Sequence, residues 1–362
     1  MSVNWGIIGA GIISGRFVED IVKLHNYPQG PNQLVHTIKG VGCSSADKAK
    51  SFIEKHLKDE ASKHNPVIGS YDEIFDNVDI DAVYIGVLHP FHKELSIKAL
   101  KKGKHVLCEK PVTMNAGELE DIIEVAKKTN KLFMEAMWVR FFPTFVALQK
   151  MVHEDKVIGE VKRVYGNYSF NADVGADHRV VNKKLGGSAL LDIGIYSLTF
   201  NRLFLNPNTK PSDWTVHSDL LKSSFTGNKE DEVDFISTVL INTGKQHGIA
   251  TSSMFNAIDE DGTIAIIEGE LGKITVKAIG LTPSPRGYKL ELKTGETSEK
   301  DFDFGSGLED SEGFYLQAVE LGERVLAGDI QSNVIPWEES LNMMRLFDKI
   351  RADNGVVFPQ DK

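Results

Sequence analysis

The sequence predicts an α/β protein in two parts: a doubly wound parallel sheet, then an α+β domain with a large, mostly antiparallel open sheet. From Val3 to about Glu135, short strands that are apolar on both faces alternate with amphipathic helices, as in a parallel sheet covered on both sides. After about Trp138, longer segments alternate apolar and polar residues, which is typical of antiparallel strands. The 362 residues also exceed the size of one ordinary hydrophobic core.

The first part, which we place at residues 1–136, carries five apolar segments that predict strands. Between the last two, residues 115–130 show apolar side chains at helical spacing, and Asn115 followed by Glu118 makes a helix cap. The strands are expected at Asn4–Gly9, Thr37–Cys43, Ala82–Leu88, His105–Cys108 and Lys131–Glu135.

The second part, placed at residues 137–362, has helical patterns in residues 141–156 and around Glu309–Ala327 and Pro336–Asp353. Turns rich in Gly, Asn and Asp separate its alternating segments, and Thr226–Asp231 and Pro283–Gly287 are expected to be loops. Strands are expected at Val161–Phe170, Thr215–Ser224, Glu232–Ile241, His247–Met254, Thr263–Glu268 and Lys273–Lys277.

Composition excludes several functional classes. With 41 basic and 51 acidic residues the net charge is −10, which disfavours non-specific nucleic-acid binding. The two cysteines, Cys43 and Cys108, give no disulfide framework and no zinc spacing, so no metal is expected. No apolar run approaches the ~20 residues of a membrane span, and the start lacks the basic region of a signal peptide. We therefore expect a cytoplasmic protein.

A glycine-rich turn follows the first predicted strand. Gly9, Ala10, Gly11, Ile12 and Ile13 lead into Ser14 and an amphipathic helix. The first glycine permits a tight turn, and the second lets the backbone approach a pyrophosphate at the helix start. Because this pattern lies between a strand and a helix, it predicts a Rossmann dinucleotide site; the alternative is a purely structural turn.

The end of the second predicted strand indicates which dinucleotide is bound. NAD sites usually place Asp or Glu there to bind the ribose 2′-hydroxyl, but residues 21–46 contain no acidic residue. Ser44, Ser45 and Lys48 follow instead, and these groups suit a 2′-phosphate. The sequence favours NADP over NAD; alternatively, Lys48 is a solvated helix residue.

Two further motifs carry candidate chemistry. Residues 107–113, LCEKPVT, place Lys110 directly after a buried strand, where a charge is costly unless it is used. Residues 186–197, GGSALLDIGIYS, place Asp192 and Tyr196 four residues apart, on one face of a helix. The alternatives are a strand that has reached the surface and a structural acid–phenol pair.

The order GIIGAGIIS, EKP, MWVRF and GGSALLDIGIYS resembles the glucose–fructose oxidoreductase/inositol dehydrogenase/MocA family. Within that family it is most similar to the branch of dimeric dihydrodiol dehydrogenases and NADP-dependent D-xylose 1-dehydrogenases. The resemblance implies hydride transfer between a sugar or diol carbinol and the nicotinamide. It also implies that Tyr196 is the acid/base, that Lys110 lies at the cofactor–substrate junction, and that Asp192 binds the sugar or orients Tyr196.

Other segments are weaker candidates. The family resemblance places residues 87–94 beside the nicotinamide, with Leu88, His89, Pro90 and His92 as cofactor neighbours, and Glu109 precedes Lys110. The two histidines lack the further ligands that a metal site needs.

Trp138 and Arg140 are candidates for the cofactor or substrate cleft, against the alternative of a core aromatic residue and a surface arginine. Arg179, in a polar loop, is a candidate substrate residue or an ordinary surface residue.

Two other functions stay open at this stage: an NADP-sensing regulator without turnover, and a reductase of a 1,5-anhydro-ketose or dicarbonyl. The presence of Lys110, Asp192 and Tyr196 favours an enzyme. The alternating segments from Glu232 to Lys277 could form an open sheet face, so we expect a homo-oligomer, a dimer through the C-terminal sheet.

Overall fold

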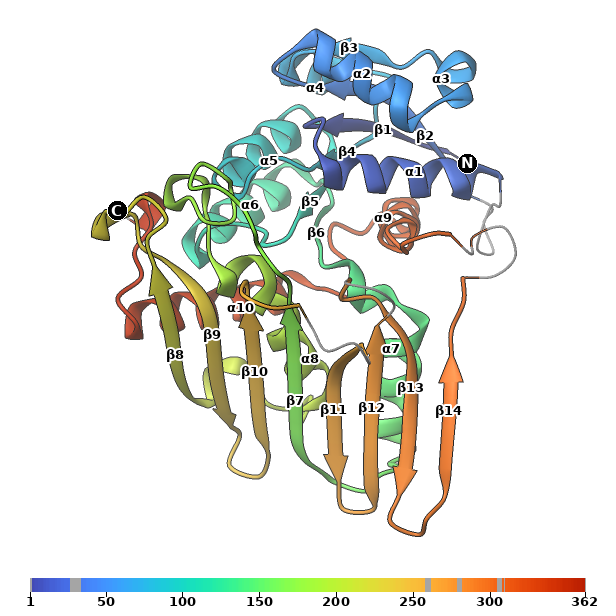
Figure 1. Cartoon of the computed structure of the whole chain (residues 1–362). Helices are drawn as coiled ribbons and strands as arrows, with labels where there is room; N and C mark the ends of the chain where they lie inside the picture. Colours follow the sequence, from blue (N-terminus) through green and yellow to red (C-terminus); the bar gives the residue numbers. More distant parts are fainter. Residues whose placement is uncertain are drawn as a thin grey trace. The chain divides into compact units, whose positions relative to one another are not determined.

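The computed structural model describes residues 2–26, 34–257, 262–278, 282–304, 308 and 310–361 (Figure 1). The chain divides into two compact units, and the division is not a single cut. Unit 1 combines Met1–Trp138 with Asp303–Leu341, and unit 2 combines Val139–Phe302 with Asn342–Lys362. Each unit is described by itself.

Unit 1 contains a six-stranded sheet in the order β3-β2-β1-β4-β5-β6, with every pair parallel. The strand order reverses between β1 and β4, which is where open α/β sheets bind ligands. This confirms the predicted doubly wound sheet. The strands are β1 (Ser2–Ile8), β2 (Val35–Gly42), β3 (Val67–Gly69), β4 (Ala82–Ile85), β5 (His105–Glu109) and β6 (Phe133–Ala136).

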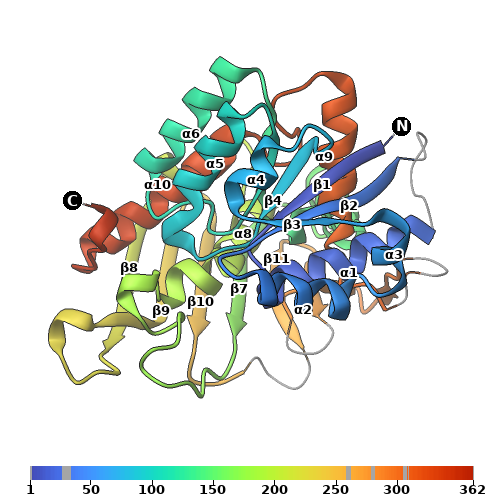
Figure 2. The same cartoon turned by 90° about the horizontal axis from the view of Figure 1, so that it is seen from above.

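Helices cover both faces of this sheet, as Figure 2 shows, with α1 and α2 on one face and α4, α5 and α6 on the other. Phe17 of α1 stacks on Tyr84 of β4 with ring centroids 4.1 Å apart, so the interface of α1 with the sheet is aromatic and buried. The helices are α1 (Ile12–Asn26), α2 (Ala46–His56), α3 (Asp59–His64), α4 (Tyr71–Asp76), α5 (His92–Lys101), α6 (Ala116–Thr129) and α9 (Tyr315–Ala327).

Unit 2 contains an eight-stranded sheet in the order β14-β13-β12-β11-β7-β10-β9-β8. Its pairs are antiparallel except β7 with β10, which confirms the predicted second sheet. The strands are β7 (Val161–Ser169), β8 (Thr215–Ser223), β9 (Val233–Asn242), β10 (His247–Ser253), β11 (Thr263–Gly269), β12 (Gly272–Ala278), β13 (Pro285–Leu292) and β14 (Thr297–Asp301).

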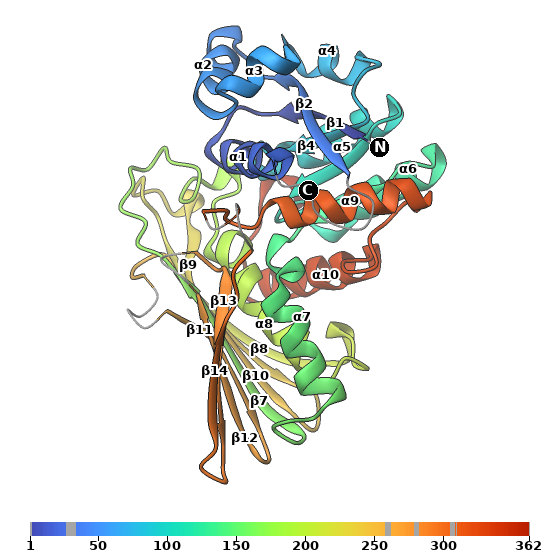
Figure 3. The same ribbon diagram turned by 90° about the vertical axis from the view of Figure 1, so that its right-hand side faces the viewer.

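One face of this sheet is covered by α7 (Pro143–Gln149) and α8 (Ile195–Phe204), which lie on the same side in Figure 3. Phe145 of α7 packs edge-on against Phe200 and Phe204 of α8, with centroids 5.3 and 5.6 Å apart. The final helix, α10 (Trp337–Asp353), contributes its residues from Asn342 onward to unit 2. None of the helices in the described ranges is both long and apolar enough to cross a membrane.

Some local predictions were wrong. The expected loop at Pro283–Gly287 runs into β13, which begins at the buried Pro285. Proline is tolerated as the first residue of a strand, so Pro285 marks the start of β13 and does not indicate a loop. Neither β3 nor β14 was predicted, because one has three residues and the other is an exposed edge strand without alternation. Glu309 lies outside the described residues, and α9 begins at Tyr315.

Candidate cofactor and catalytic sites

The glycine turn between β1 and α1 has the backbone geometry that a dinucleotide site requires. Gly9 has φ +97°, and a Cβ there would lie 2.8 Å from Cγ1 of Val87, so no other residue fits without strain. A Cβ on Gly11 would meet nothing closer than 3.8 Å. Ile12, the first residue of α1, is 81% exposed and lines the cleft described below.

Ser14 brings α1 close to the end of β4. It is fully buried, and a Cβ on Gly86 would lie 2.3 Å from its hydroxyl oxygen. A small residue in α1 and a glycine after β4 therefore allow the close helix–strand contact that the third glycine of the fingerprint usually provides. Ile13 is half-buried beside Ser14.

A cleft of about 570 Å³ adjoins the turn and contains Lys48 of α2. Ser45 caps α2, with Lys48 N–H donating to its hydroxyl oxygen over 3.4 Å, and Ser44 is exposed just before it. The structure thus places Lys48 in one cleft with the glycine turn, whereas Ser44 and Ser45 do not line this cleft, and the role of all three in binding NADP stays a prediction. Sequence reasoning missed other residues that line this cleft: Arg16, Glu19, Asp47, Ser51, Phe52, Lys55, His56 and Glu312.

The turns that follow β4 and β5 are joined by a buried histidine. His92 Nδ1 lies 3.0 Å from the Pro111 carbonyl oxygen, and its Nε2 lies 3.0 Å from that of Val87. Burial lowers the pKa of His92, although its contacts with the backbone of Val87, Pro111 and Val112 act in the opposite direction. His92 therefore holds the two loops that were predicted to border the nicotinamide.

The other predicted residues of this loop lie close by. His89 is buried with its ring 5.8 Å from that of His92, whereas Leu88 and Pro90 are half-buried. Within the described part of the chain, no three His, Cys, Asp or Glu side chains form a group that could hold a metal.

Lys110 occupies the carboxyl end of β5, and the preceding residue anchors it. Glu109 is buried and accepts a 2.6 Å hydrogen bond from the Tyr84 hydroxyl. Its other carboxylate oxygen accepts from the Lys110 N–H at 3.3 Å. The Lys110–Pro111 peptide is cis, and the Lys110 side chain is half-buried. The lysine thus lies at the edge of the parallel sheet where ligands bind.

In unit 2, the predicted acid and phenol lie on a buried helical segment. Residues Leu190–Gly194 form a π-helix that continues into α8, and Asp192 and Tyr196 are both buried. Such π segments are frequent at functional sites. Arg179 Nη1 lies 3.4 Å from Asp192 Oδ2, so the structure brings together two predicted substrate residues. The ring of Tyr168 from β7 packs edge-on against Tyr196 with centroids 5.2 Å apart.

A buried carboxyl holds the start of this helix, and sequence reasoning did not find it. Asp234 of β9 is fully buried and accepts the Leu190 N–H at 2.6 Å. Ser188 hydrogen-bonds the same carboxyl and accepts the Leu191 N–H at 3.1 Å. Burial raises the pKa of Asp234. Further along the helix, the Ser197 hydroxyl donates to the Thr251 carbonyl at 2.6 Å, so the sheet fixes the helix at several points.

The remaining predicted residues have mixed placements. Trp138 is buried, and its ring stacks on that of Phe314 with centroids 4.3 Å apart. Packing in the core therefore explains why Trp138 is buried. Arg140 is half-buried in a 3-10 turn. A ligand role for either residue stays a prediction.

Residues 3–137 match the model of the oxidoreductase family with an NAD-binding Rossmann fold, GFO/IDH/MocA. Residues 145–275 match the GFO/IDH/MocA C-terminal domain. The chain belongs to the GFO/IDH/MocA family. This confirms the resemblance of the sequence motifs, and it makes residues 3–137 an NAD(P)-binding Rossmann domain.

Relatives of known activity cover nearly the whole chain. Trans-1,2-dihydrobenzene-1,2-diol dehydrogenase of Xenopus laevis is 31% identical over 99% of this chain and 100% of its own length. The D-xylose 1-dehydrogenase (NADP(+)) of Hypocrea jecorina is 29% identical over 99% of this chain and 94% of its own. A 3-ketoreductase of Actinomadura kijaniata, solved with NADP, shares the fold at TM-score 0.78 with 22% identity, covering 97% of this chain and 98% of its own.

Proposed function

We propose that this protein is an NADP-dependent dehydrogenase or reductase that acts on a carbinol of a sugar or diol. The substrate would be C1 of a D-xylose-like aldose or a trans-dihydrodiol, the substrates named for the relatives above. The observation that carries the proposal is that a chain with a G-x-G-x-x-S turn after β1 also has Lys110 directly after β5, and has Asp192 and Tyr196 buried on one helical segment.

The proposed chemistry divides between the cofactor and the chain. When bound, the nicotinamide supplies the hydride acceptor. The residues of the chain move the proton: in the oxidation direction Tyr196 takes the proton of the carbinol hydroxyl as the carbon loses hydride. The product is a carbonyl, or a lactone when the carbinol is the anomeric C1–OH of an aldopyranose.

Tyr196 needs help to act as a base near neutral pH. An unperturbed phenol has a pKa near ~10, and a nearby ammonium favours the phenolate. We assign that ammonium to Lys110, which also binds the substrate hydroxyl. Asp192, already paired with Arg179 at 3.4 Å, binds further substrate hydroxyls or orients Tyr196. The same residues run the reverse reaction on a ketone or dicarbonyl.

The preference for NADP rests on charge. Residues 21–46 contain no carboxylate for a ribose 2′-hydroxyl, while Lys48 lines the cleft beside the glycine turn. The remaining cofactor contacts are proposed for the glycine turn, Ser44 and Ser45, the loop from Leu88 to His92, and Glu109, Lys110, Trp138 and Arg140. Residues 1–136 would then bind the cofactor, and residues 137–362 would bind the substrate.

We also propose that the protein is a cytoplasmic homo-oligomer that pairs through the sheet of unit 2. The face of that sheet opposite α7 and α8 carries exposed or half-exposed apolar residues among polar ones. These include Leu240, which is 49% exposed, together with Ile236, Ile249, Ile266 and Tyr165. Light scattering after size-exclusion chromatography tests this, and Leu240→Lys is expected to shift the protein toward the monomer.

Cofactor reduction followed by absorbance tests the main proposal. NADP and NAD are each offered with a panel of aldoses and trans-diols, and Lys110→Ala is measured in parallel. Turnover with NADP that Lys110→Ala nearly abolishes supports the dehydrogenase. Tight NADP binding without turnover of any substrate, in either direction, contradicts it and favours an NADP-sensing regulator.

A further inference from the structure

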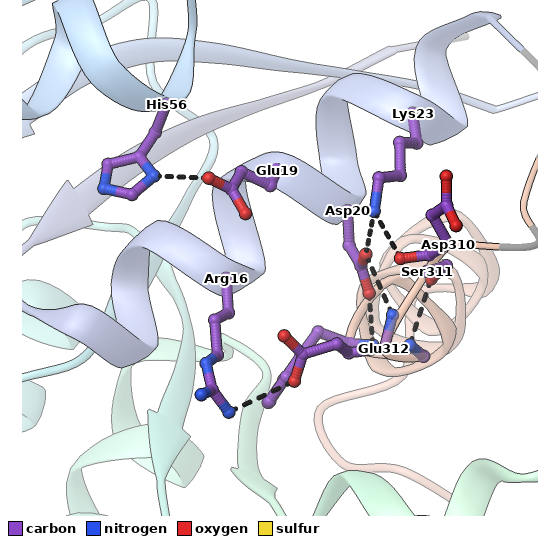
Figure 4. Close-up of polar contacts among 10 residues, drawn as sticks. Arg16, Glu19, Asp20, Lys23, His56, Asp310, Ser311 and Glu312 are labelled. Carbon is purple, nitrogen blue, oxygen red and sulfur yellow. Dashed lines mark hydrogen bonds and ion pairs between the residues drawn. The ribbon is translucent and has the colours of Figure 1, made fainter. Parts of the chain in front are cut away.

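The segment before α9 is tied along α1 by a buried acid. Asp20 of α1 is 1% exposed, and its carboxylate accepts the Glu312 N–H at 3.2 Å and the Phe314 N–H at 2.8 Å. Lys23, one turn further on, donates to the Asp310 carbonyl at 2.7 Å. Figure 4 shows these contacts converging on one side of α1. Residues 310–314 are therefore fixed in place although they lie almost 300 positions from α1 in the sequence.

This attachment places Glu312 in the wall of the cofactor cleft. Among the described residues that line the cleft, Glu312 alone comes from outside residues 10–56. Its Oε2 lies 3.2 Å from Nη1 of Arg16, on the second turn of α1 (Figure 4). Burial raises the pKa of the Glu312 carboxyl, so its carboxylate is partly stripped of water in this position.

Arg16 is suited to bind a phosphate. Its guanidinium projects from α1 beside the glycine turn, where the phosphates of a dinucleotide meet the helix start, and arginine binds phosphate through two parallel hydrogen bonds. The side chains of Arg16 and Glu312 are 44% and 37% exposed. Exposed ion pairs are weak, so a phosphate dianion can displace the carboxylate.

Glu19, an acid of α1 that also lines the cleft, has a different partner from Glu312. Glu19 Oε1 lies 2.7 Å from His56 Nδ1 on α2, and Figure 4 shows it directed toward His56. Both Glu19 and Glu312 line the same cleft. Three acids, Glu19, Asp47 and Glu312, therefore line one cleft, and Glu312 is the one that forms an ion pair with Arg16.

We propose that Arg16 binds a phosphate group of the dinucleotide and that Glu312 competes with that phosphate for Arg16, which lowers cofactor affinity and speeds release. The inference rests on the proposed function, since it requires a dinucleotide in this cleft. It adds a determinant of affinity from residues 310–314, which no dinucleotide fingerprint includes.

The test is the Kd for NADP and for NAD, measured by titration calorimetry on the full-length protein at fixed ionic strength. Glu312→Gln is expected to tighten binding about fivefold, by freeing Arg16 from a weak pair. Arg16→Gln is expected to weaken it about tenfold, the usual effect of losing a charged hydrogen bond. In the Arg16→Gln background, Glu312→Gln should not lower the Kd for either dinucleotide further.

Asp310→Asn is the matched control, because it removes one negative charge from the same segment at an exposed position outside the cleft lining, and it should change Kd less than twofold. If Glu312→Gln tightens the binding of NADP but not of NAD, Arg16 contacts the 2′-phosphate. If it tightens the binding of both equally, Arg16 contacts the pyrophosphate. The inference is overturned if Glu312→Gln leaves Kd unchanged, if Asp310→Asn tightens binding equally, or if Glu312→Gln still tightens binding in the Arg16→Gln background. If the wild type binds neither dinucleotide, the proposed function itself fails.

Discussion

The cofactor end of unit 1 and the helix that carries Tyr196 in unit 2 are built by different means. In unit 1 the site is shaped mainly by the backbone. Gly9 adopts φ +97°, and Ser14 packs against Gly86, which brings α1 close to the sheet. In unit 2 the helix that carries Tyr196 is held by side chains, because Asp234 and Ser188 accept hydrogen bonds from the first amides of the π-helix.

The difference reflects what each site must present. A dinucleotide site offers backbone amides to phosphates, so glycines that allow close approach determine its shape. An acid/base site must hold one hydroxyl in place, so it needs buried hydrogen bonds behind the residue that reacts. We therefore expect substitutions in unit 1 to change mainly cofactor binding and those around the unit 2 helix to change mainly turnover.

The largest expected effect is that of Tyr196→Phe. Removing the proposed acid/base should lower kcat by about 10²- to 10⁴-fold, while the Kd for NADP stays within about twofold of wild type. Steady-state kinetics and a binding titration measure the two quantities. Tyr168→Phe, which alters the neighbouring ring, is the control and should lower kcat far less. Equal losses in the two variants would contradict the role of Tyr196.

Two buried groups, His36 in unit 1 and Asp234 in unit 2, should change the pH dependence of stability with opposite signs. Burial lowers the pKa of His36 to about 4, so its contribution to stability is present above its unfolded pKa near ~6.5 and is lost as pH falls toward 4. The loss would reach about 3 kcal/mol. Burial raises the pKa of Asp234, so the stability it contributes is present below its unfolded pKa and is lost as pH rises through the folded one.

Urea unfolding between pH 4 and pH 7 measures this difference. His36→Phe should flatten the fall in stability at low pH, whatever its effect on stability at pH 7. The explanation for His36 is wrong if wild type and variant show the same pH slope.

Asp234→Ala should reduce stability by about 1–3 kcal/mol, because the Leu190 N–H is left buried without its acceptor. The same variant should lower kcat while leaving NADP affinity unchanged. Denaturant unfolding and kinetics are compared with Asp219→Ala, at an exposed position on β8, which should change neither. A variant as stable and active as wild type would show that Asp234 does not hold the helix.

A smaller effect is expected for Gly11→Ala. The added Cβ meets only the Gly86 carbonyl oxygen at 3.8 Å, so stability should change by less than about 1 kcal/mol. A pyrophosphate that approaches this backbone would be obstructed, and NADP affinity should fall roughly tenfold. Thermal unfolding and a binding titration separate the two effects. Unchanged affinity would place the phosphates elsewhere.

Much of this architecture follows from local pattern. All strands of unit 1 except β3 were predictable because each is a short apolar run between helices. The sequence also predicted that Asp192 and Tyr196 lie on a helix, but not that this helix begins as a π-helix. Asp234, Tyr168 and Glu312 were not predictable. Each reaches its site through pairing or packing with a segment distant in sequence, and nothing in its own neighbourhood signals that contact.

The central claim is that hydride passes from a substrate carbinol to NADP. It is tested most directly with D-xylose deuterated at C1 and a trans-diol deuterated at its carbinol carbons, followed by mass spectrometry of the reduced cofactor. The account predicts that one deuterium appears on the NADPH formed from at least one of these substrates, and that Tyr196→Phe forms almost none. NADPH without deuterium, or no reduction from either substrate by the wild type, would contradict it.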